Sequence, residues 1–340
     1  MQKKTIYILG IESSCDDTSA AIMQNKKVLS SVTATQGIHE DYGGVVPELA
    51  SRAHQQNIVP VVHQALSKAN IDKKLLSAIA FTRGPGLLGS LLVGTSFAKS
   101  LALGLGVPLI EVNHMQAHIL AHFIEDPDME PPPFPFLALT ISGGHTQIVL
   151  VKDFFHMEIL GETLDDAVGE AFDKSGKVLG LPYPSGPLMD NYAQLGNPMA
   201  YPFPKPKVAG LNFSFSGLKT SILYFIQKET AANPNFVSQN RNDICASIQH
   251  TIVGILMDKL KAAIKQTGIK EIAIGGGVSA NSGIRNALKI AEEKYGWKPY
   301  LPKLEYCTDN AAMIGITGYL KLRDNRLAGQ DISAKARYSL

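Results

Sequence analysis

The stretch Ile6–Met23 reads IYILGIESSCDDTSAAIM, in which two apolar runs flank a turn of small polar residues. The same pattern returns at Phe136–Val151, FLALTISGGHTQIVLV, where Ser142–Thr146 separates the two runs. Apolar runs joined by a short polar turn predict a β-hairpin in each stretch. Two similar hairpins roughly 130 residues apart predict two related lobes.

Helices are predicted between and after the hairpins. Pro47–Ala69 begins with a proline, which suits a first helical turn, and Leu87–Leu105 has the small, apolar composition of a buried helix. Asp243–Thr267 has apolar residues at helical spacing. A short buried strand at Glu271–Ile274 and a further helix at Asn281–Glu293 follow. Strands that alternate with helices predict an α/β fold.

The composition is that of a globular protein. The 340 residues are 45% apolar and 18% charged, with a formal net charge of +2. This length allows one large domain or two lobes. The small net charge excludes a uniformly basic surface, so any affinity for nucleic acid must come from local patches or from a partner.

The chain has three cysteines, which are far apart and fit no C-x-x-C pattern: Cys15, Cys245 and Cys307. A disulfide framework or a cysteine zinc site is therefore not expected. The apolar run Ile6–Ile11 is too short for a secretion signal, and Lys99 interrupts the longest apolar stretch, Gly84–Ile110. We expect a reduced, soluble protein of the cytoplasm that does not cross a membrane.

Three glycine-rich turns follow predicted strands, at Gly84–Gly86, Ser142–Thr146 and Gly275–Gly277. Glycine lets backbone N–H groups approach an anion, and a strand, a glycine turn and a helix start often seat a phosphate or nucleotide. Each turn alone also fits an ordinary tight turn. Their combination in one chain favours a ligand site.

A histidine pair is the best candidate for a metal site. His114 and His118 are four residues apart, which places both rings on one side of a helix, although His118 and His122 share that spacing. Asp309 could complete a site of two imidazoles and one carboxylate, suited to iron(II) or zinc. The alternatives are surface or capping histidines and a helix N-cap at Asp309.

The spacing does not fit a zinc metalloprotease. Such an enzyme needs a glutamate directly after the first histidine as general base. Met115 and Gln116 occupy that space here.

Two acidic residues are further candidates for ligand binding. Asp173 and Asp190 could accept hydrogen bonds from hydroxyl or amino groups, because an ionised carboxylate is a pure acceptor. The alternative is charge on a helix surface.

Nine ordered blocks connect these residues to a known family: Gly10–Thr18, Asp41–Arg52, Gly84–Leu87, His114 with His118, Ser142–Thr146, Gly169–Lys174, Asn212–Lys219, Gly275–Asn281 and Cys307–Asn310. In them the chain closely resembles the TsaD family, bacterial relatives of the universal Kae/Gcp proteins. The resemblance implies a two-lobed α/β fold with a central cleft, like actin, Hsp70 and sugar kinases. We expect an N-terminal lobe at 1–112, with a C-terminal helix at about 322–340 packing on it. The expected C-terminal lobe, 113–321, carries the metal and most of the ligand site.

The resemblance also implies an activity. It is the transfer of a threonylcarbamoyl group from threonylcarbamoyl-AMP to the N6 amine of the adenosine 3′ of the anticodon, in tRNAs that read codons beginning with A. Family metal ligands correspond to His114, His118 and Asp309, with iron(II) expected and zinc as the alternative. The nucleotide-type ligand, with ATP or ADP as alternative occupants, corresponds to Thr140, Ile141, Ser142, Gly143, Gly144, Asp173, Gly186, Asp190 and Asn281.

The remaining expectations concern the amine and the partners. Glu12, or else Asp16, could orient the incoming amine. The family implies tRNA, a TsaB-like paralogue and a TsaE-like ATPase as partners, and we expect the apolar helices around residues 50–105 to contact the TsaB-like protein. The chain departs from many members at Gln116-Ala117, where Glu-Gly is common, and at Ser185, where Gly is common.

Two further functions compete with this one. A kinase or ATPase of the same fold would act on a small molecule, but Mg–ATP sites prefer carboxylates and water to a histidine pair. A non-catalytic scaffold protein would keep its function when residues of the His/Asp cluster are changed.

Overall fold

The computed structural model describes residues 5–340 and divides into two compact units. The first unit comprises the described residues up to Pro131 together with Pro302–Leu340, and the second is Pro132–Leu301. The chain therefore leaves the first unit once and returns to it.

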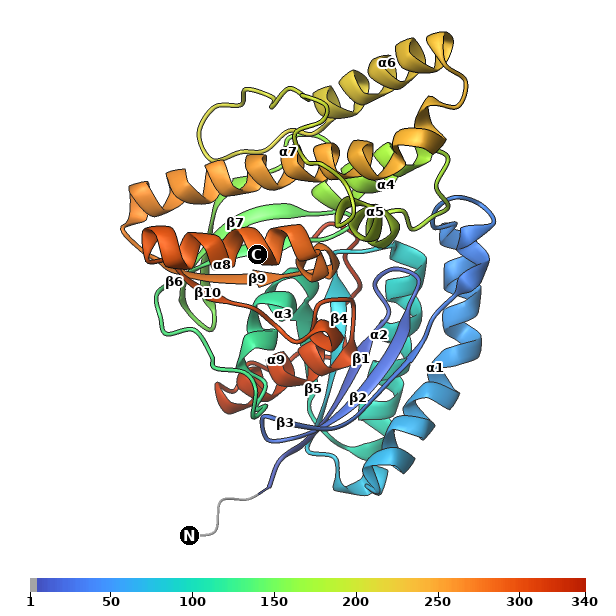
Figure 1. Ribbon diagram of the computed structural model, residues 1–340. Helices are drawn as coiled ribbons and strands as arrows, with labels where there is room; N and C mark the ends of the chain where they lie inside the picture. Colours follow the sequence, from blue (N-terminus) through green and yellow to red (C-terminus); the bar gives the residue numbers. More distant parts are fainter. Residues whose placement is uncertain (1–4) are drawn as a thin grey trace. The chain divides into compact units, whose positions relative to one another are not determined.

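A five-stranded sheet forms the centre of the first unit, in the order β3 (Lys27–Ala34), β2 (Thr18–Gln24), β1 (Tyr7–Glu12), β4 (Ala78–Gly84), β5 (Leu109–Asn113) (Figure 1). β1, β2 and β3 are antiparallel neighbours, whereas β4 and β5 run parallel to β1. The predicted first hairpin is confirmed, with Tyr7 opposite Gln24 and Glu12 opposite Ser19.

The helices of the first unit are α1 (Pro47–Ala69), α2 (Leu88–Leu105), α3 (His114–Leu120) and α9 (Ala311–Arg323), with short 3₁₀ turns at Gly37–Glu40, Lys73–Leu75, Ala121–Phe123 and Leu304–Tyr306. Side chains alternate between the faces of a strand. Leu9 and Ile11 therefore pack in one core with residues of α1 and α2, whereas Ile8 and Gly10 face α9. Because both faces are covered, β1 is apolar at nearly every position.

Glycines allow α9 to lie directly on the sheet. A Cβ at Gly10 would overlap the carbonyl oxygen of Ala311 and lie 2.7 Å from the amide nitrogen of Gly315. A Cβ at Gly318 would collide with the side chain of Ala80. This close approach sets the position of the N-terminal end of α9, just after Asp309.

The second unit repeats the arrangement of the first. Its sheet has the order β10 (Lys298–Tyr300), β9 (Glu271–Gly275), β6 (Phe136–Ile141), β7 (Thr146–Asp153), β8 (His156–Glu162). β6, β7 and β8 are antiparallel neighbours, and β9 and β10 run parallel to β6. The strands correspond one to one with those of the first sheet, so the prediction of two related lobes is confirmed.

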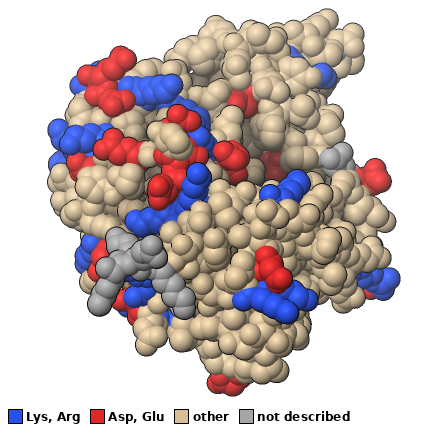
Figure 2. All heavy atoms as spheres, turned by 90° about the horizontal axis from the view of Figure 1, so that it is seen from below, with Lys and Arg blue, Asp and Glu red and all other residues tan. Residues whose placement is uncertain are grey.

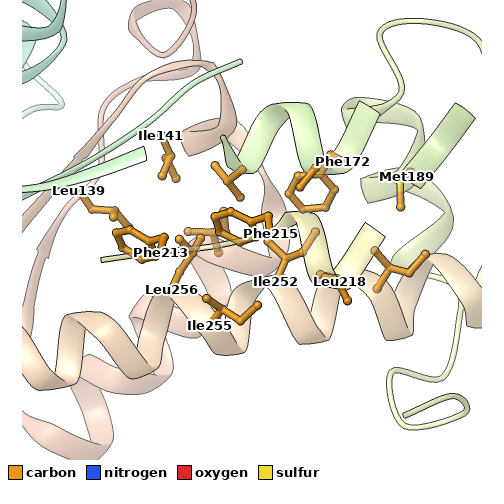
Figure 3. Packing of buried hydrophobic residues seen from close by; sticks show 14 of the residues in the cluster. Leu139, Ile141, Phe172, Met189, Phe213, Phe215, Leu218, Ile252, Ile255 and Leu256 are labelled. Atoms are coloured by element: carbon orange, nitrogen blue, oxygen red, sulfur yellow. The ribbon is translucent and has the colours of Figure 1, made fainter. Parts of the chain in front are cut away.

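The helices of the second unit are α4 (Val168–Val178), α5 (Gly186–Ala193), α6 (Ser216–Ala232), α7 (Phe236–Thr267) and α8 (Ser282–Tyr295), with a 3₁₀ turn at Gly277–Ala280. Figure 3 shows side chains of β6, α4 and α7 meeting around Phe213 and Phe215, which precede α6. These two rings are stacked 6.3 Å apart. This core fixes the end of β6 relative to α4.

The boundaries of the units differ from the expected ones. His114, His118 and Asp309 belong to the first unit, not to a C-terminal lobe at 113–321. The first four residues of the expected N-terminal lobe, 1–112, lie outside the described residues.

The helix expected at about 322–340 is also absent from the structure. α9 ends at Arg323, and Asn325 adopts a left-handed φ of 55° that a helix cannot continue through. Residues 324–340 instead lie along β4 and β5. Ala328 N donates to Leu109 O at 2.8 Å and Lys335 N donates to Arg83 O at 2.8 Å.

Among residues 5–340, α2 is the one helix long and apolar enough to cross a bilayer by composition alone. It packs against α1 and β4, and its residues Leu91, Ala98 and Ala102 are buried in the first unit. Helices in protein cores pass the same test, so this composition is weak support for a membrane span.

We predict that Gly10→Ala lowers the free energy of unfolding by about 1–3 kcal/mol or more, because the new methyl group meets the backbone of α9. The matched control is Gly104→Ala in α2, where the added Cβ has no neighbour within 4 Å. That change should raise stability by about 0.4–1 kcal/mol. Chemical denaturation measures both, and an unchanged stability of Gly10→Ala would contradict the close approach.

Candidate functional site

Asn113 places both histidines. It ends β5 and is the N-cap of α3, where its Oδ1 accepts hydrogen bonds from Met115 N at 2.9 Å and Gln116 N at 3.1 Å. His114 is the first residue of α3, and His118 follows one turn later on the same side. Their rings make an edge-to-face contact with centroids 4.7 Å apart.

Asp309 meets both imidazoles. Its Oδ1 lies 3.3 Å from Nε2 of His114 and 3.2 Å from Nε2 of His118. The N-cap of α9 is Asn310, whose Oδ1 accepts from Met313 N, so the capping alternative for Asp309 is wrong. The ligand atoms of the three residues all lie within 4.8 Å of one another.

Glu12 contacts the His114 ring at Nδ1, the ring nitrogen that does not face Asp309. Its Oε2 lies 2.9 Å from Nδ1 of His114 and accepts from the Thr82 hydroxyl at 2.7 Å, while Oε1 accepts from Ser14 N at 2.5 Å. A carboxylate on Nδ1 fixes a proton there, so the Nε2 lone pair is free to face a metal ion. Glu12 itself is fully buried.

Opposite charges compensate burial in this cluster. Burial would lower the pKa of His114, but the charges of Asp309 and Glu12 raise it well above its usual range. Burial would raise the pKa of Asp309 and of Glu12, and His114 lowers both. Burial lowers the pKa of His118. The two carboxylates on either side of the His114 ring therefore stabilise its charged form.

These residues fit a divalent metal ion. Two imidazole nitrogens and one carboxylate oxygen converge, a donor set that binds iron(II) or zinc and leaves positions for a substrate. Glu12 lies against Nδ1 of His114, but the buried Nδ1 of His118 has no hydrogen-bond partner.

The predicted ligand residues of the second unit begin at the end of β6. In the turn that follows, Ser142 N donates to His145 O at 2.9 Å, so this amide is used within the turn. Gly143 and Gly144 are exposed, and an added Cβ on either would meet nothing within 4 Å. Thr140 and Ile141 are fully buried in β6.

The other candidates hold the starts of helices. Asp173 Oδ1 accepts from the amides of Ser185 and Gly186 at 2.8 and 3.2 Å, and thereby fixes the start of α5. Burial raises the pKa of Asp173, although these two donors oppose the shift.

Asp190 and Asn281 fix the start of α8 by hydrogen bonds to its first residues. The carboxylate of Asp190 accepts from both the amide and the hydroxyl of Ser282, at 2.9 and 2.7 Å. Asn281 caps α8 through Ile284 N and donates to Gln249 Oε1 at 2.7 Å. Both side chains are engaged within the protein, so their contribution to a ligand site is the placement of α8.

Hydrogen bonds and close packing join these parts of the second unit. Gly169 N donates to Ser142 O, which joins α4 to the turn after β6. Gly276 has a φ of 89°, and a Cβ there would collide with the carbonyl of Ile141. The turns at Ser142–Thr146 and Gly275–Gly277 are therefore neighbours.

The third glycine turn, Gly84–Gly86, is not an open cradle. Gly86 N donates to Ala336 O at 3.1 Å, and a Cβ on Gly86 would strike the backbone of Ser14. Its glycines serve close packing inside the first unit, not an anion.

Thr82, Ser14 and Asn113 contribute to the cluster but were not predicted as site residues. An asparagine directly before a predicted helix is an N-cap signal, so Asn113 could have been found. Thr82 reaches Glu12 only because β1 and β4 are neighbours in the sheet, which local patterns do not reveal.

Comparisons with known proteins agree on one family. The family model TsaD, tRNA N6-adenosine threonylcarbamoyltransferase, matches residues 27–316. A protein of that description from Christiangramia forsetii is 71% identical over 338 residues, which is 99% of each chain. One from Riemerella anatipestifer is 64% identical over 337 residues, again 99% of each chain.

A solved structure matches the fold. Component A of (R)-2-hydroxyglutaryl-CoA dehydratase from Acidaminococcus fermentans has a TM-score of 0.54 at 16% identity, covering 94% of this chain and 99% of that one. At this identity the likeness shows the fold alone, which is of the actin, Hsp70 and sugar-kinase type.

Asp17, in the turn after β1, gives a pH-dependent prediction. Burial, with the charges of Asp16, Asp309 and Glu12, raises its pKa from 3.8 to about 6, and its Oδ1 is buried without a partner. The folded state therefore disfavours the ionised form, at a cost of roughly 3 kcal/mol at most. This cost is present above pH 6 and disappears as the pH falls below the unfolded value of 3.8.

We predict that Asp17→Asn stabilises the chain at pH 8 and loses this advantage near pH 4. Chemical denaturation at pH 8, 6 and 4 measures it, with the exposed Asp331→Asn as control. An equal effect of Asp17→Asn at all three pH values would contradict the prediction.

Proposed function

The chain belongs to the TsaD family of tRNA N6-adenosine threonylcarbamoyltransferases, and we propose that it transfers a threonylcarbamoyl group to tRNA. The donor is threonylcarbamoyl-AMP, and the acceptor is the N6 amine of the adenosine 3′ of the anticodon, in tRNAs that read codons beginning with A. The observation that carries this proposal is the cluster of His114, His118 and Asp309, with Glu12 behind His114.

The reaction is an acyl transfer. The donor is a mixed carbamoyl–phosphate anhydride, so it is already activated. The adenosine nitrogen forms a bond to the carbamoyl carbon and loses a proton, while the bond from that carbon to the phosphate oxygen breaks and AMP leaves. Negative charge builds on the carbonyl oxygen and on the departing phosphate.

The metal ligands would be His114, His118 and Asp309. An ion bound there supplies a Lewis acid that lowers the energy of developing negative charge. We take iron(II) as the ion, with zinc as the alternative, because two imidazoles and a carboxylate suit both. The His-rich donor set argues against a kinase or ATPase that depends on Mg–ATP.

Glu12 is proposed as a positioning residue. Its carboxylate is buried and accepts hydrogen bonds at both oxygens, so it acts through His114 and not on the amine. It keeps the proton of His114 on Nδ1 and thereby keeps Nε2 available to the metal. This assignment replaces the expectation that Glu12 orients the incoming amine.

The nucleotide part of the donor is proposed to bind in the second unit. The exposed turn at Gly143 and Gly144 suits a phosphate, because no side chain blocks its backbone. Asp173 and Asp190 hold the starts of α5 and α8, and Gly186 and Asn281 mark those starts. ATP or ADP would occupy the same place.

Three partners are proposed. The tRNA is one. On the face in Figure 2 basic side chains are interspersed with acidic ones, so local patches would make any contact with tRNA on that face. A TsaB-like paralogue would cover exposed apolar residues of α2, among them Leu92 and Leu103. A TsaE-like ATPase is the third. We place the protein in the cytoplasm, where tRNA is modified.

The metal assignment predicts that His114→Ala with His118→Ala removes bound metal and lowers transfer to tRNA by roughly 10²-fold or more. Metal analysis and incorporation of labelled threonine, with the donor-making synthase, the partner proteins, bicarbonate and ATP, measure the two effects. His63→Ala, an exposed histidine on α1, is the control. Circular dichroism reports whether the fold persists, and full activity of the double variant would remove the metal from the mechanism.

The partner assignment predicts that Leu92→Glu with Leu103→Glu abolishes co-purification with the TsaB-like protein. The two positions are eleven residues apart in α2, so they lie on one face. Leu195→Glu, at an exposed leucine of the second unit, should bind normally. Undiminished binding of the α2 variant would place the contact elsewhere.

A further inference from the structure

Both polar atoms of the Asn113 side-chain amide form hydrogen bonds within the protein. Its Oδ1 caps α3, as described above, and its Nδ2 donates to the carbonyl oxygens of Tyr338 and Ser339, each at 3.1 Å. These acceptors belong to the last three residues of the chain. One amide therefore links the C-terminal residues to the turn that begins with His114.

The rest of the C-terminal segment is attached to the same edge of the first unit. Lys335 N donates to Arg83 O at 2.8 Å, and Arg83 Nε donates to Ser333 O at 2.9 Å. A Cβ on Gly84 would collide with the carbonyl oxygen of Lys335, so the segment lies directly on the end of β4.

The side chain of Tyr338 adds a second attachment. Arg83 lies over its ring, 5.2 Å from the centroid, and forms an ion pair of 2.5 Å with Glu111 of β5. The Tyr338 hydroxyl lies 3.3 Å from the same Glu111 oxygen. These contacts bring the carbonyl groups of residues 338 and 339 to Asn113.

We propose that the C-terminal residues Tyr338 and Ser339 position the metal-ligand helix α3 by hydrogen bonding to Asn113. This inference rests on the proposed metal centre of His114, His118 and Asp309. Asn113 is the residue next to His114, so the direction of its amide sets the start of α3.

The consequence for the metal follows from distance. Nε2 of His114 and of His118 must both stay near Oδ1 of Asp309, which belongs to a different segment of the chain. A metal site tolerates little displacement of its ligands, and loss of supporting hydrogen bonds commonly weakens metal binding 10–100-fold. Asn113, Tyr338 and Ser339 are positioning residues in this sense.

The test compares two shortened chains, one ending at Arg337 and one ending at Ser339. The first loses both acceptors. The second lacks only Leu340 and keeps the Tyr338 carbonyl and an oxygen of Ser339, which there belongs to the terminal carboxylate and still accepts. Co²⁺ alone is titrated into each metal-free protein and followed by its visible absorption. We expect the chain ending at Arg337 to bind Co²⁺ 10–100-fold more weakly than the full chain. The chain ending at Ser339 should bind within twofold of it.

A second variant separates positioning from folding. Asn113→Ser keeps an oxygen that can cap α3 but removes the Nδ2 donor. It should weaken Co²⁺ binding to a similar degree, and adding the Arg337 ending should cause no further loss, because both changes break the same link. Hydrogen exchange at the amides of Met115 and Gln116 should be faster in the chain ending at Arg337 than in the chain ending at Ser339.

The outcomes separate this inference from the proposed function. Unchanged Co²⁺ affinity in the chain ending at Arg337, or losses that multiply when combined with Asn113→Ser, would overturn the role of the C-terminal residues. A full chain that binds Co²⁺ but transfers nothing to tRNA would contradict the proposed function alone. A full chain that binds no Co²⁺ would overturn both.

Discussion

Two carboxylates, the fully buried Glu12 and the partly exposed Asp309, share one buried imidazole and hold the candidate centre together. Glu12 and Asp309 lie on either side of His114, and their charges raise its pKa well above its usual range. An unpaired charge at such a depth would cost several kcal/mol. The end of β1, the start of α3 and the segment before α9 are therefore constrained to meet.

The fold of the first unit makes this meeting possible. Gly10 lets the backbone of α9 approach β1, which brings Asp309 to the end of the sheet where Glu12 lies. β5 delivers Asn113 and then α3 at the same end, because β5 runs parallel to β1 through β4. Parallel strands gather their C-terminal ends along one edge, and binding residues of such sheets commonly follow those ends. The positions of the residues in the candidate centre thus depend on strand direction as much as on residue type.

Local sequence patterns predicted an element well where residues at both of its ends mark where it starts and stops. α1 runs from Pro47 to Ala69 as expected, because a proline start and an Asn70 cap in the left-handed region both mark its ends. α7 begins at Phe236 and not at Asp243, because a short helical stretch precedes the predicted apolar stripe and joins it across a kink at Asn240, where φ is −119°. The region after Arg323 was expected to be helical but lies along β4 and β5, held by contacts with residues more than 200 positions away.

The sequence by itself determined which residues could bind a metal and that the chain forms two similar α/β units. The His114–His118 spacing and the paired hairpins depend on neighbours within a few residues, so periodicity is enough to find them. Only the tertiary structure decided that Asp309 joins the histidines in the first unit, that Glu12 supports one of them, and that Gly84–Gly86 packs against the chain's own C-terminal segment. These are contacts between distant segments, and their energies depend on burial and strand order, which no local pattern contains.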